Sequence, residues 1–192
     1  MKGQLDGTGA RHDGILRLLL WGGAVALLML PAIAMQFSAE VKWDALDFLV
    51  AGVMLATVCG LVDLALRRSG GMDRGHRLSY RAGAALAALT GFLETWANLA
   101  VGFLGEPGNP ANFLFFGIVG IALVGALLAR LRPHGLAVAM TVAALAQVGG
   151  SVYAIVTGYV PEAVISLVLA GMWVASAWLF QRADRQTPRE QT

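Results

Sequence analysis

The sequence predicts an all-α membrane protein: a polytopic bundle of six transmembrane helices with both termini on the cytoplasmic side (N-in, C-in). The chain of 192 residues is 57% hydrophobic and only 14% charged, whereas soluble domains have about 25% charged residues. Six apolar runs approach or exceed the length of about 20 helical residues that crosses a hydrocarbon core. The basic residues gather in alternate connections between these runs, as membrane topology requires.

The polar cytoplasmic segment 1–14 precedes the first apolar run, 15–35. Arg11 and Arg17 come before an apolar core, and Pro31 is followed by small residues. This pattern also fits a signal peptide with a cleavage site. Because the run is long enough to span a membrane and a second apolar tract follows, we expect a retained helix, with cleavage left as the alternative.

Five more apolar runs follow, at 45–66, 82–104, 113–131, 136–158 and 163–180, and then a polar cytoplasmic tail, 181–192. Two of them carry small residues at every fourth position. These are Gly52, Ala56 and Gly60 in the second run and Gly83, Ala87 and Gly91 in the third. Such faces let helix backbones approach closely, so we expect the bundle to assemble through them.

The loop charges predict the topology. With a cytoplasmic N-terminus, thirteen of the fourteen basic residues fall on the inner side and only Lys42 falls outside. A bias this complete indicates an even number of spans with both ends inside. Twelve arginines against two lysines favour a bacterial origin, and so a multi-pass protein of the bacterial cytoplasmic (inner) membrane.

Glu94 is the most informative polar residue, because it lies near the middle of the third run. A central acidic charge costs about 2.5–3.5 kcal/mol in a bilayer, so this carboxyl group must face a partner, water or a cavity, or stay protonated. Thr90, Glu94 and Asn98 recur every four residues and share one helix face. Gln147, near the middle of the fifth run, is the natural partner of Glu94. The pattern fits an ion, proton or substrate site, and it also fits a structural hydrogen bond between helices.

Three further polar residues stand at predicted outer boundaries. Asp44 and Asp47 lie at the outer start of the second run, where they could gather cations in an outer vestibule or simply supply the acidic residues that helix N-termini prefer. Asn112 ends the loop 105–112 and is placed to cap the helix that begins at Phe113. A role for this loop in closing over the Glu94 stripe is the alternative.

Residue types for other chemistry are missing from the predicted spans. The histidines, His12, His76 and His134, lie outside them, and Cys59 is the single cysteine. No metal-binding spacing and no nucleophile motif is present, so we expect neither an enzyme nor a bound cofactor or metal. No basic patch with interleaved aromatic residues indicates nucleic acid, and the lipid bilayer is the predicted partner.

Three segments carry a resemblance. Residues 96–102 read Trp-Ala-Asn-Leu-Ala-Val-Gly, residues 109–112 read Asn-Pro-Ala-Asn, and residues 130–133 read Arg-Leu-Arg-Pro. In this region the chain resembles a family of small, uncharacterised bacterial polytopic membrane proteins with an Asn-Pro-Ala-Asn loop, to which no activity is assigned. The resemblance implies membrane residence and carries over no functional residue.

Two functions are compatible with these patterns. In the first, the protein is a small proton- or ion-coupled transporter or permease in which Glu94 binds the ion and Thr90, Asn98 and Gln147 line the site. In the second, it is a non-catalytic membrane subunit or scaffold that binds another membrane protein, or a second copy of itself, through its Gly/Ala helix faces. An intramembrane enzyme is the function we expect least.

Overall fold

The computed structural model describes residues 3–38, 40–106 and 108–185, with the backbone alone for residues 3–12. This part contains six α-helices, one short 3-10 helix and no strand, which confirms the all-α prediction. The α-helices are α1 (Gly3–Phe37), α2 (Ala45–Arg68), α3 (Arg74–Ala100), α4 (Phe113–Leu128), α5 (Pro133–Val156) and α6 (Val160–Arg185), and the 3-10 helix η1 covers Pro110–Asn112. The chain divides into two compact units, Met1–Leu66 and Arg67–Thr192.

Five described helices are long and apolar enough to cross a membrane, within Asp13–Phe37, Ala45–Arg68, Pro110–Leu128, Pro133–Val156 and Val160–Arg185. α3 is 27 residues long but less apolar, because Glu94, Asn98 and several arginines lie along it. The helices are compatible with a multi-pass integral membrane protein. A sixth span through α3 and the placement of both termini inside stay predictions.

The helices extend past several of the predicted apolar runs. α1 begins at Gly3 and α3 at Arg74, and α6 continues to Arg185. Helical hydrogen bonding continues into polar residues, where hydrophobicity no longer marks the helix. At its other end α3 stops at Ala100 instead of residue 104, and Gly102 and Gly105 follow with φ values of 75° and 76°, in the left-handed region that glycine tolerates best.

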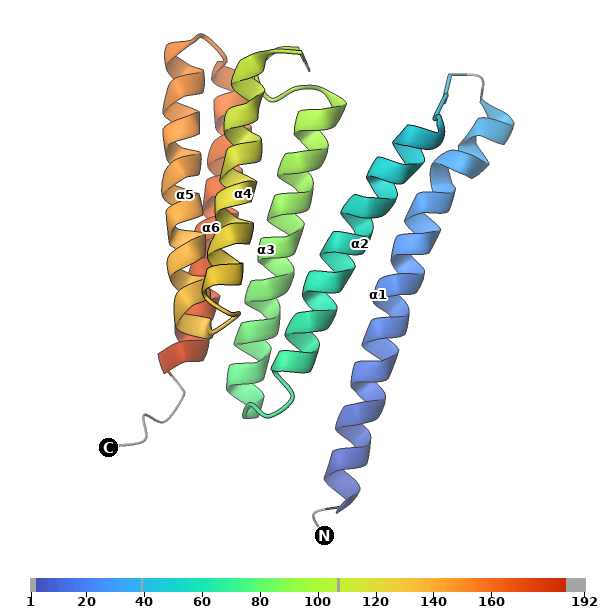
Figure 1. The fold of residues 1–192 in the computed structure, drawn as a ribbon, viewed down its shortest axis with the longest axis vertical. Coiled ribbons are helices and arrows are strands. Elements are labelled where there is room, and N and C mark those ends of the chain that lie inside the picture. The colour runs from blue at the N-terminus through green and yellow to red at the C-terminus, as the bar shows by residue number, and fades with distance from the viewer. Residues whose placement is uncertain (1–2, 39, 107, 186–192) are drawn as a thin grey trace. The chain divides into compact units, whose positions relative to one another are not determined.

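In the first unit, α1 and α2 form an antiparallel hairpin (Figure 1). Arg17 Nε lies 2.6 Å from Asp63 Oδ1, so an ion pair joins the two helices. On the small-residue face of α2, a Cβ placed at Gly52 would lie 3.7 Å from Leu28 Cδ2. This is an ordinary van der Waals distance, so a methyl group at residue 52 would fit between the two helices without displacing Leu28.

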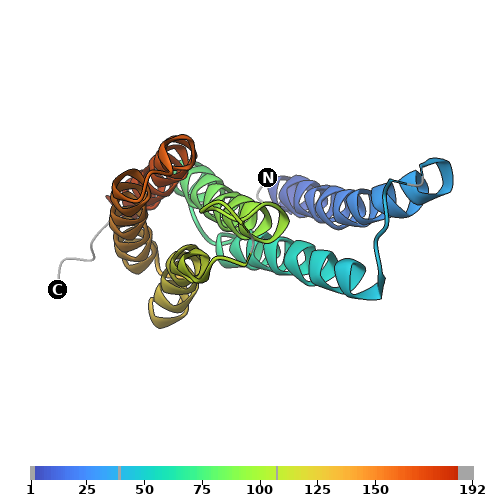
Figure 2. The ribbon, with the colours of Figure 1, turned by 90° about the horizontal axis from the view of Figure 1, so that it is seen from above.

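In the second unit, α3, α4, α5 and α6 run alternately up and down as a bundle (Figures 1 and 2). α6 packs against both α5 and α3, and α4 packs against α5 and α3. α3 and α6 approach each other closely at Gly83, where a Cβ would lie 3.3 Å from atoms of Leu179 and Phe180. Ser176 Oγ also donates to the Gly83 carbonyl over 2.9 Å. The small-residue face of α3 is thus used inside the bundle.

Polar side chains lie inside this bundle and large apolar side chains lie on its surface. Seven polar residues of this unit are at most 1% exposed, namely Ser69, Thr90, Glu94, Gln147, Ser151, Ser166 and Ser176. In contrast, Leu127, Leu128 and Val156 are 74%, 80% and 80% exposed. An apolar exterior of this extent would be unfavourable in water. It suits helices whose outer faces meet lipid and whose polar groups find partners between helices.

Candidate functional site

Glu94 lies at the centre of the α3–α6 bundle and is fully buried. Trp173 Nε1, from α6, donates to Glu94 Oε2 over 3.3 Å, and the amide of Gln147, from α5, lies against the same carboxyl group. Both partners are neutral side chains. Within the described residues, no ion pair involves Glu94. The predicted proximity of Glu94 and Gln147 is therefore present in the structure.

The Gln147 amide lies between the Glu94 carboxyl group and the Ser166 hydroxyl group. With its nitrogen toward Glu94, Nε2 donates to Oε1 over 2.7 Å and the amide oxygen accepts from Ser166 Oγ over 3.1 Å. With its oxygen toward Glu94, Nε2 donates to Ser166 Oγ over 3.1 Å, and a protonated Glu94 would complete the arrangement by donating to the amide oxygen. The first orientation suits an ionised carboxylate and the second a neutral carboxyl group.

Two serines extend this chain of hydrogen bonds along the α5–α6 interface. Ser151 Oγ lies 2.7 Å from Ser166 Oγ and also donates to the Gln147 carbonyl over 2.9 Å. A hydroxyl group both donates and accepts hydrogen bonds. The Ser166 and Ser151 hydroxyl groups can therefore reorient and stay hydrogen-bonded when the Gln147 amide rotates. The core thus holds a continuous hydrogen-bonded row from Glu94 through Gln147 to Ser166 and Ser151.

Thr90 lies on the same buried face of α3 as Glu94, but its hydroxyl group forms its hydrogen bond within its own helix. Its hydroxyl group donates to the Leu86 carbonyl over 2.7 Å, an i to i−4 bond common for threonine in helices. Thr90 is fully buried, so it lies in the same core as Glu94. The described hydrogen bonds do not join the two side chains.

Asn98 belongs to the loop after α3 and not to the Glu94 contacts. Its Nδ2 donates to the Asn112 carbonyl over 2.9 Å, and its Oδ1 accepts from the Phe103 N–H over 3.3 Å. Phe103 in turn stacks on Phe115, with ring centroids 4.3 Å apart. Asn98 therefore fastens the loop to the end of α3, one turn beyond Glu94 on the same helix face.

The prediction that the Asn112 side chain caps α4 is wrong. Asn112 Oδ1 accepts from the Leu104 N–H over 2.7 Å, and Nδ2 donates to the Glu106 carbonyl over 2.8 Å. The capping side chain is Asn109, whose Oδ1 accepts from the Ala111 N–H over 3.0 Å at the start of η1. Asn112 is itself buried and turns toward the loop, where it pairs with backbone groups, which need hydrogen-bond partners when they are buried.

Asp44 and Asp47 close the N-terminal end of α2 in the first unit. Asp44 Oδ1 accepts from the N–H groups of Leu46 and Asp47 over 2.8 and 2.9 Å, and Asp47 Oδ2 accepts from the Asp44 N–H over 2.9 Å. This reciprocal arrangement is a capping box. It supports the capping interpretation of the two residues, whereas their role in an outer vestibule stays a prediction.

Sequence reasoning missed the contributions of Trp173 and Ser166 to the site. Both lie on α6 in a row of buried residues at helical spacing, Ser166, Ala170, Trp173, Ala177 and Phe180. A stripe of small residues around one indole and one hydroxyl, in an otherwise apolar helix, is the signal that would have placed them at an interface.

Chemically, Glu94 can bind and release a proton, and the Gln147 amide can turn to form a hydrogen bond with either protonation state. Comparisons with protein-family models, with curated proteins and with solved structures found no match. The functional proposal therefore depends on the geometry of this site.

Proposed function

We propose that this chain is a six-span bacterial inner-membrane protein, N-in and C-in, that works as a small proton-coupled transporter with Glu94 as the proton-binding group. The observation that supports the proposal is a fully buried carboxyl group whose hydrogen-bonding partners, Trp173 and Gln147, are both neutral. An ionisable residue is costly to keep among membrane-spanning helices, so its presence there favours a functional role.

The neutral surroundings of Glu94 make its ionised form costly while the site is closed, since a buried charge without a partner loses its solvation. Exposure to water on either side would favour release of the proton. Gln147 can then turn its nitrogen toward the carboxylate, and Ser166 can donate to the amide oxygen. The same residues thus serve both states of the group, as a site that cycles between them requires.

The direct test is proton flux in proteoliposomes that contain either the wild type or Glu94→Gln. We expect the wild type to dissipate an imposed pH gradient and the folded Glu94→Gln protein to lose this flux. Glu106→Gln is the matched control, because Glu106 lies exposed in the loop after α3 and its variant should retain wild-type flux. Equal flux in wild type and Glu94→Gln would contradict the role of Glu94.

A second candidate, a membrane subunit or scaffold, is favoured by the complete burial of the Glu94 site. A group already satisfied by Trp173 and Gln147 can act as a polar link between helices and nothing more. Within the first unit, the α2 face is also open at Gly60, where a Cβ would meet no described atom of that unit within 4 Å. Such an opening is suited to a partner helix.

The two functions differ in the access of water to the site. Thr90→Cys in a Cys59→Ser background places one thiol on the Glu94 face. Transport predicts that small polar thiol reagents modify this residue during turnover, because water must reach Glu94. A scaffold predicts no modification of Thr90→Cys under any condition, with the protein retaining a partner after gentle detergent extraction.

A further inference from the structure

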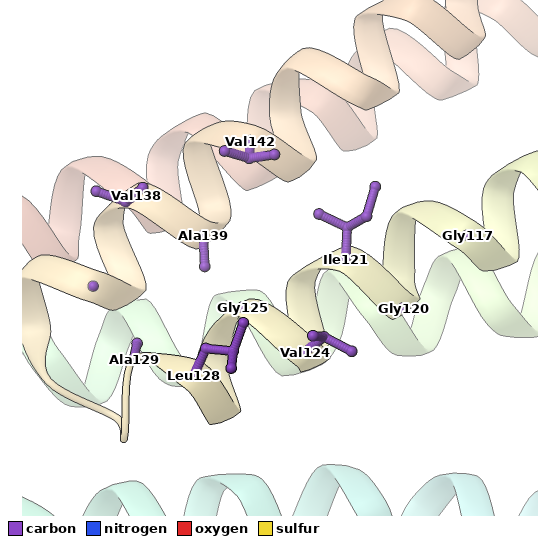
Figure 3. Close-up of a pocket in the computed structure, with 11 residues that line it drawn as sticks. Gly117, Gly120, Ile121, Val124, Gly125, Leu128, Ala129, Val138, Ala139 and Val142 are labelled. Atoms are coloured by element: carbon purple, nitrogen blue, oxygen red, sulfur yellow. The ribbon is translucent and has the colours of Figure 1, made fainter.

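An apolar groove of about 800 Å³ lies between α4 and α5 on the surface of the second unit. Figure 3 shows its lining, in which Ala139 of α5 points toward Gly125 of α4 while the two helices separate farther from their turn. The residues that form its walls include Gly117, Gly120, Ile121, Val124, Val138 and Val142. The lining also reaches Ala129 and Gly135, which flank the α4–α5 turn.

Two exposed arginines, Arg130 and Arg132, lie in this turn at the end of the groove. Within the described residues, neither arginine forms an ion pair. Beside the turn, Asp184 Oδ2 of α6 lies 3.3 Å from His134 Nδ1. The groove therefore ends at positive charge that no carboxylate of the described chain neutralises.

Arg130 adopts a backbone conformation that glycine would adopt more easily. Its φ is 49°, and the hydrogen bonds from Arg130 N to Leu127 O (2.9 Å) and from Leu131 N to Ala126 O (3.2 Å) form a Schellman motif at the end of α4. α5 ends in the same motif, with Gly158 at the corresponding position and a φ of 90°. Arginine at this position of α4 stabilises the turn less than glycine would.

Neighbouring side chains hold the turn in this conformation. Arg68 Nη1 donates to the Arg130 carbonyl over 3.2 Å, and Tyr80 Oη donates to the Leu131 carbonyl over 2.8 Å. These bonds fix the backbone from which the Arg130 side chain projects, and they bring a third exposed guanidinium group, that of Arg68, to the turn.

We propose that the α4–α5 groove and the arginines of its turn bind one anionic phospholipid, with an acyl chain in the groove and the phosphate of the headgroup at Arg130 and Arg132. The apolar lining complements an acyl chain, and guanidinium groups pair with phosphate oxygens in two-point hydrogen bonds. Basic sites between transmembrane helices on the cytoplasmic side are suited to anionic headgroups. This inference needs residence in a membrane and does not depend on transport.

The charge at the turn favours a lipid over a second protein helix as the occupant. An apolar helix would fill the same groove, but it would leave the guanidinium groups of Arg130 and Arg132 without a counter-charge. An anionic lipid complements both the apolar groove and the two guanidinium groups. A neutral lipid such as phosphatidylcholine offers the same acyl chain with less net attraction to the arginines.

The test counts lipids bound to the purified protein by native mass spectrometry, with phosphatidylglycerol and phosphatidylcholine offered in equal amounts. Wild type should retain phosphatidylglycerol preferentially. The double variant Arg130→Gly/Arg132→Ala should bind it about 30-fold more weakly, the combined effect of two arginines at an anionic surface. Because Arg130→Gly removes an unfavourable φ, this variant should be no less thermally stable than wild type, so its loss of binding cannot come from unfolding.

Two further variants test the groove itself. Gly120→Leu fills the groove, and a Cβ at Gly120 meets nothing within 4 Å among the described atoms, so the protein should fold while retaining less phosphatidylglycerol. Gly149→Leu has the same open surroundings on α5 outside the groove and serves as its control. Arg74→Ala, an exposed arginine at the start of α3, is the control for charge.

Several outcomes would overturn the inference. These are equal retention of the two lipids by wild type, unchanged phosphatidylglycerol binding in the arginine double variant, and unchanged binding in Gly120→Leu. Complete displacement of the lipid by inorganic phosphate would reveal a simple anion site with no contribution from the groove. A photo-crosslinker at Val138 that captures another polypeptide in place of lipid would assign the groove to a protein partner.

Discussion

Trp173 Nε1 donates to Glu94 Oε2 over 3.3 Å and joins α6 to α3 across residues 79 positions apart in the chain. Trp173 is 2% exposed and Glu94 is fully buried. In this closed arrangement neither group can exchange the hydrogen bond for one with water, so the pair should contribute both to the stability of the bundle and to the proton affinity of the carboxyl group.

Trp173→Phe removes the indole donor and keeps an aromatic ring in the core. We expect the free energy of unfolding in detergent to fall by about 1–3 kcal/mol, the usual cost of leaving a buried polar group without a partner. Thermal unfolding followed by circular dichroism measures the change. Trp96→Phe is the control, because Trp96 is 55% exposed, and a loss as large in this control would show that the Trp173–Glu94 bond is not responsible.

Ser166→Ala removes the hydroxyl group that pairs with the Gln147 amide. We expect a loss of about 0.6 kcal/mol, the average for polar pairs between membrane helices. A double-mutant cycle with Gln147→Leu should show that the two effects are not additive, because both residues belong to one hydrogen-bonded row. Additive losses would mean that Ser166 and Gln147 act independently.

Gly83→Leu should separate α3 from α6. A Cβ at residue 83 would lie 3.3 Å from Leu179 and Phe180, and the larger side chain must displace them, at a cost of about 1–3 kcal/mol. Gly171→Leu on α6 is the matched control, because a Cβ there meets nothing within 4 Å among the described atoms. Thermal unfolding of the two variants should therefore differ, and equal stability would contradict the close α3–α6 contact.

Asn112→Ala should loosen the loop that follows α3. The variant leaves the Leu104 N–H and the Glu106 carbonyl without the side-chain partner that each has at 2.7 and 2.8 Å. We expect faster proteolysis at residues 105–109 and a loss of about 1–3 kcal/mol. Asn112→Asp keeps the acceptor for the Leu104 N–H and loses the donor to the Glu106 carbonyl, so its stability should lie between those of Asn112→Ala and wild type. An Asn112→Asp protein as labile as Asn112→Ala would assign the effect to the Glu106 bond alone.

Much of the fold could be predicted because hydrophobicity along the chain reports which segments avoid water. The stretches 45–66 and 136–158 closely match α2 and α5. α3 shows the limit of this signal. Its polar face lowers its mean hydropathy, and among the described helices it falls outside those apolar enough to span a membrane, although it packs in the bundle with α4 and α6.

The proximity of Glu94 and Gln147 could also be predicted, because two polar groups at the same depth of an apolar bundle gain by pairing. The third partner could not. A tryptophan side chain packs well in an apolar core in any case. The presence of Trp173 in an apolar run therefore does not indicate that its N–H donates to a carboxyl group. Asn112 was misjudged for a related reason, since a capping position in the sequence does not reveal which backbone groups the loop buries.

The sequence by itself determined that the chain is all-α and has helices apolar enough to span a membrane. Hydrophobic periodicity and composition are local properties of the chain, and they decide which segments avoid water. The sequence also determined that Glu94 needs a special environment. Only the tertiary structure decided what that environment is: neutral donors from α5 and α6, a serine pair beyond Gln147, and a groove that ends at two arginines. These features depend on contacts between segments distant in the chain, and their geometry follows from how side chains pack, which no local pattern encodes.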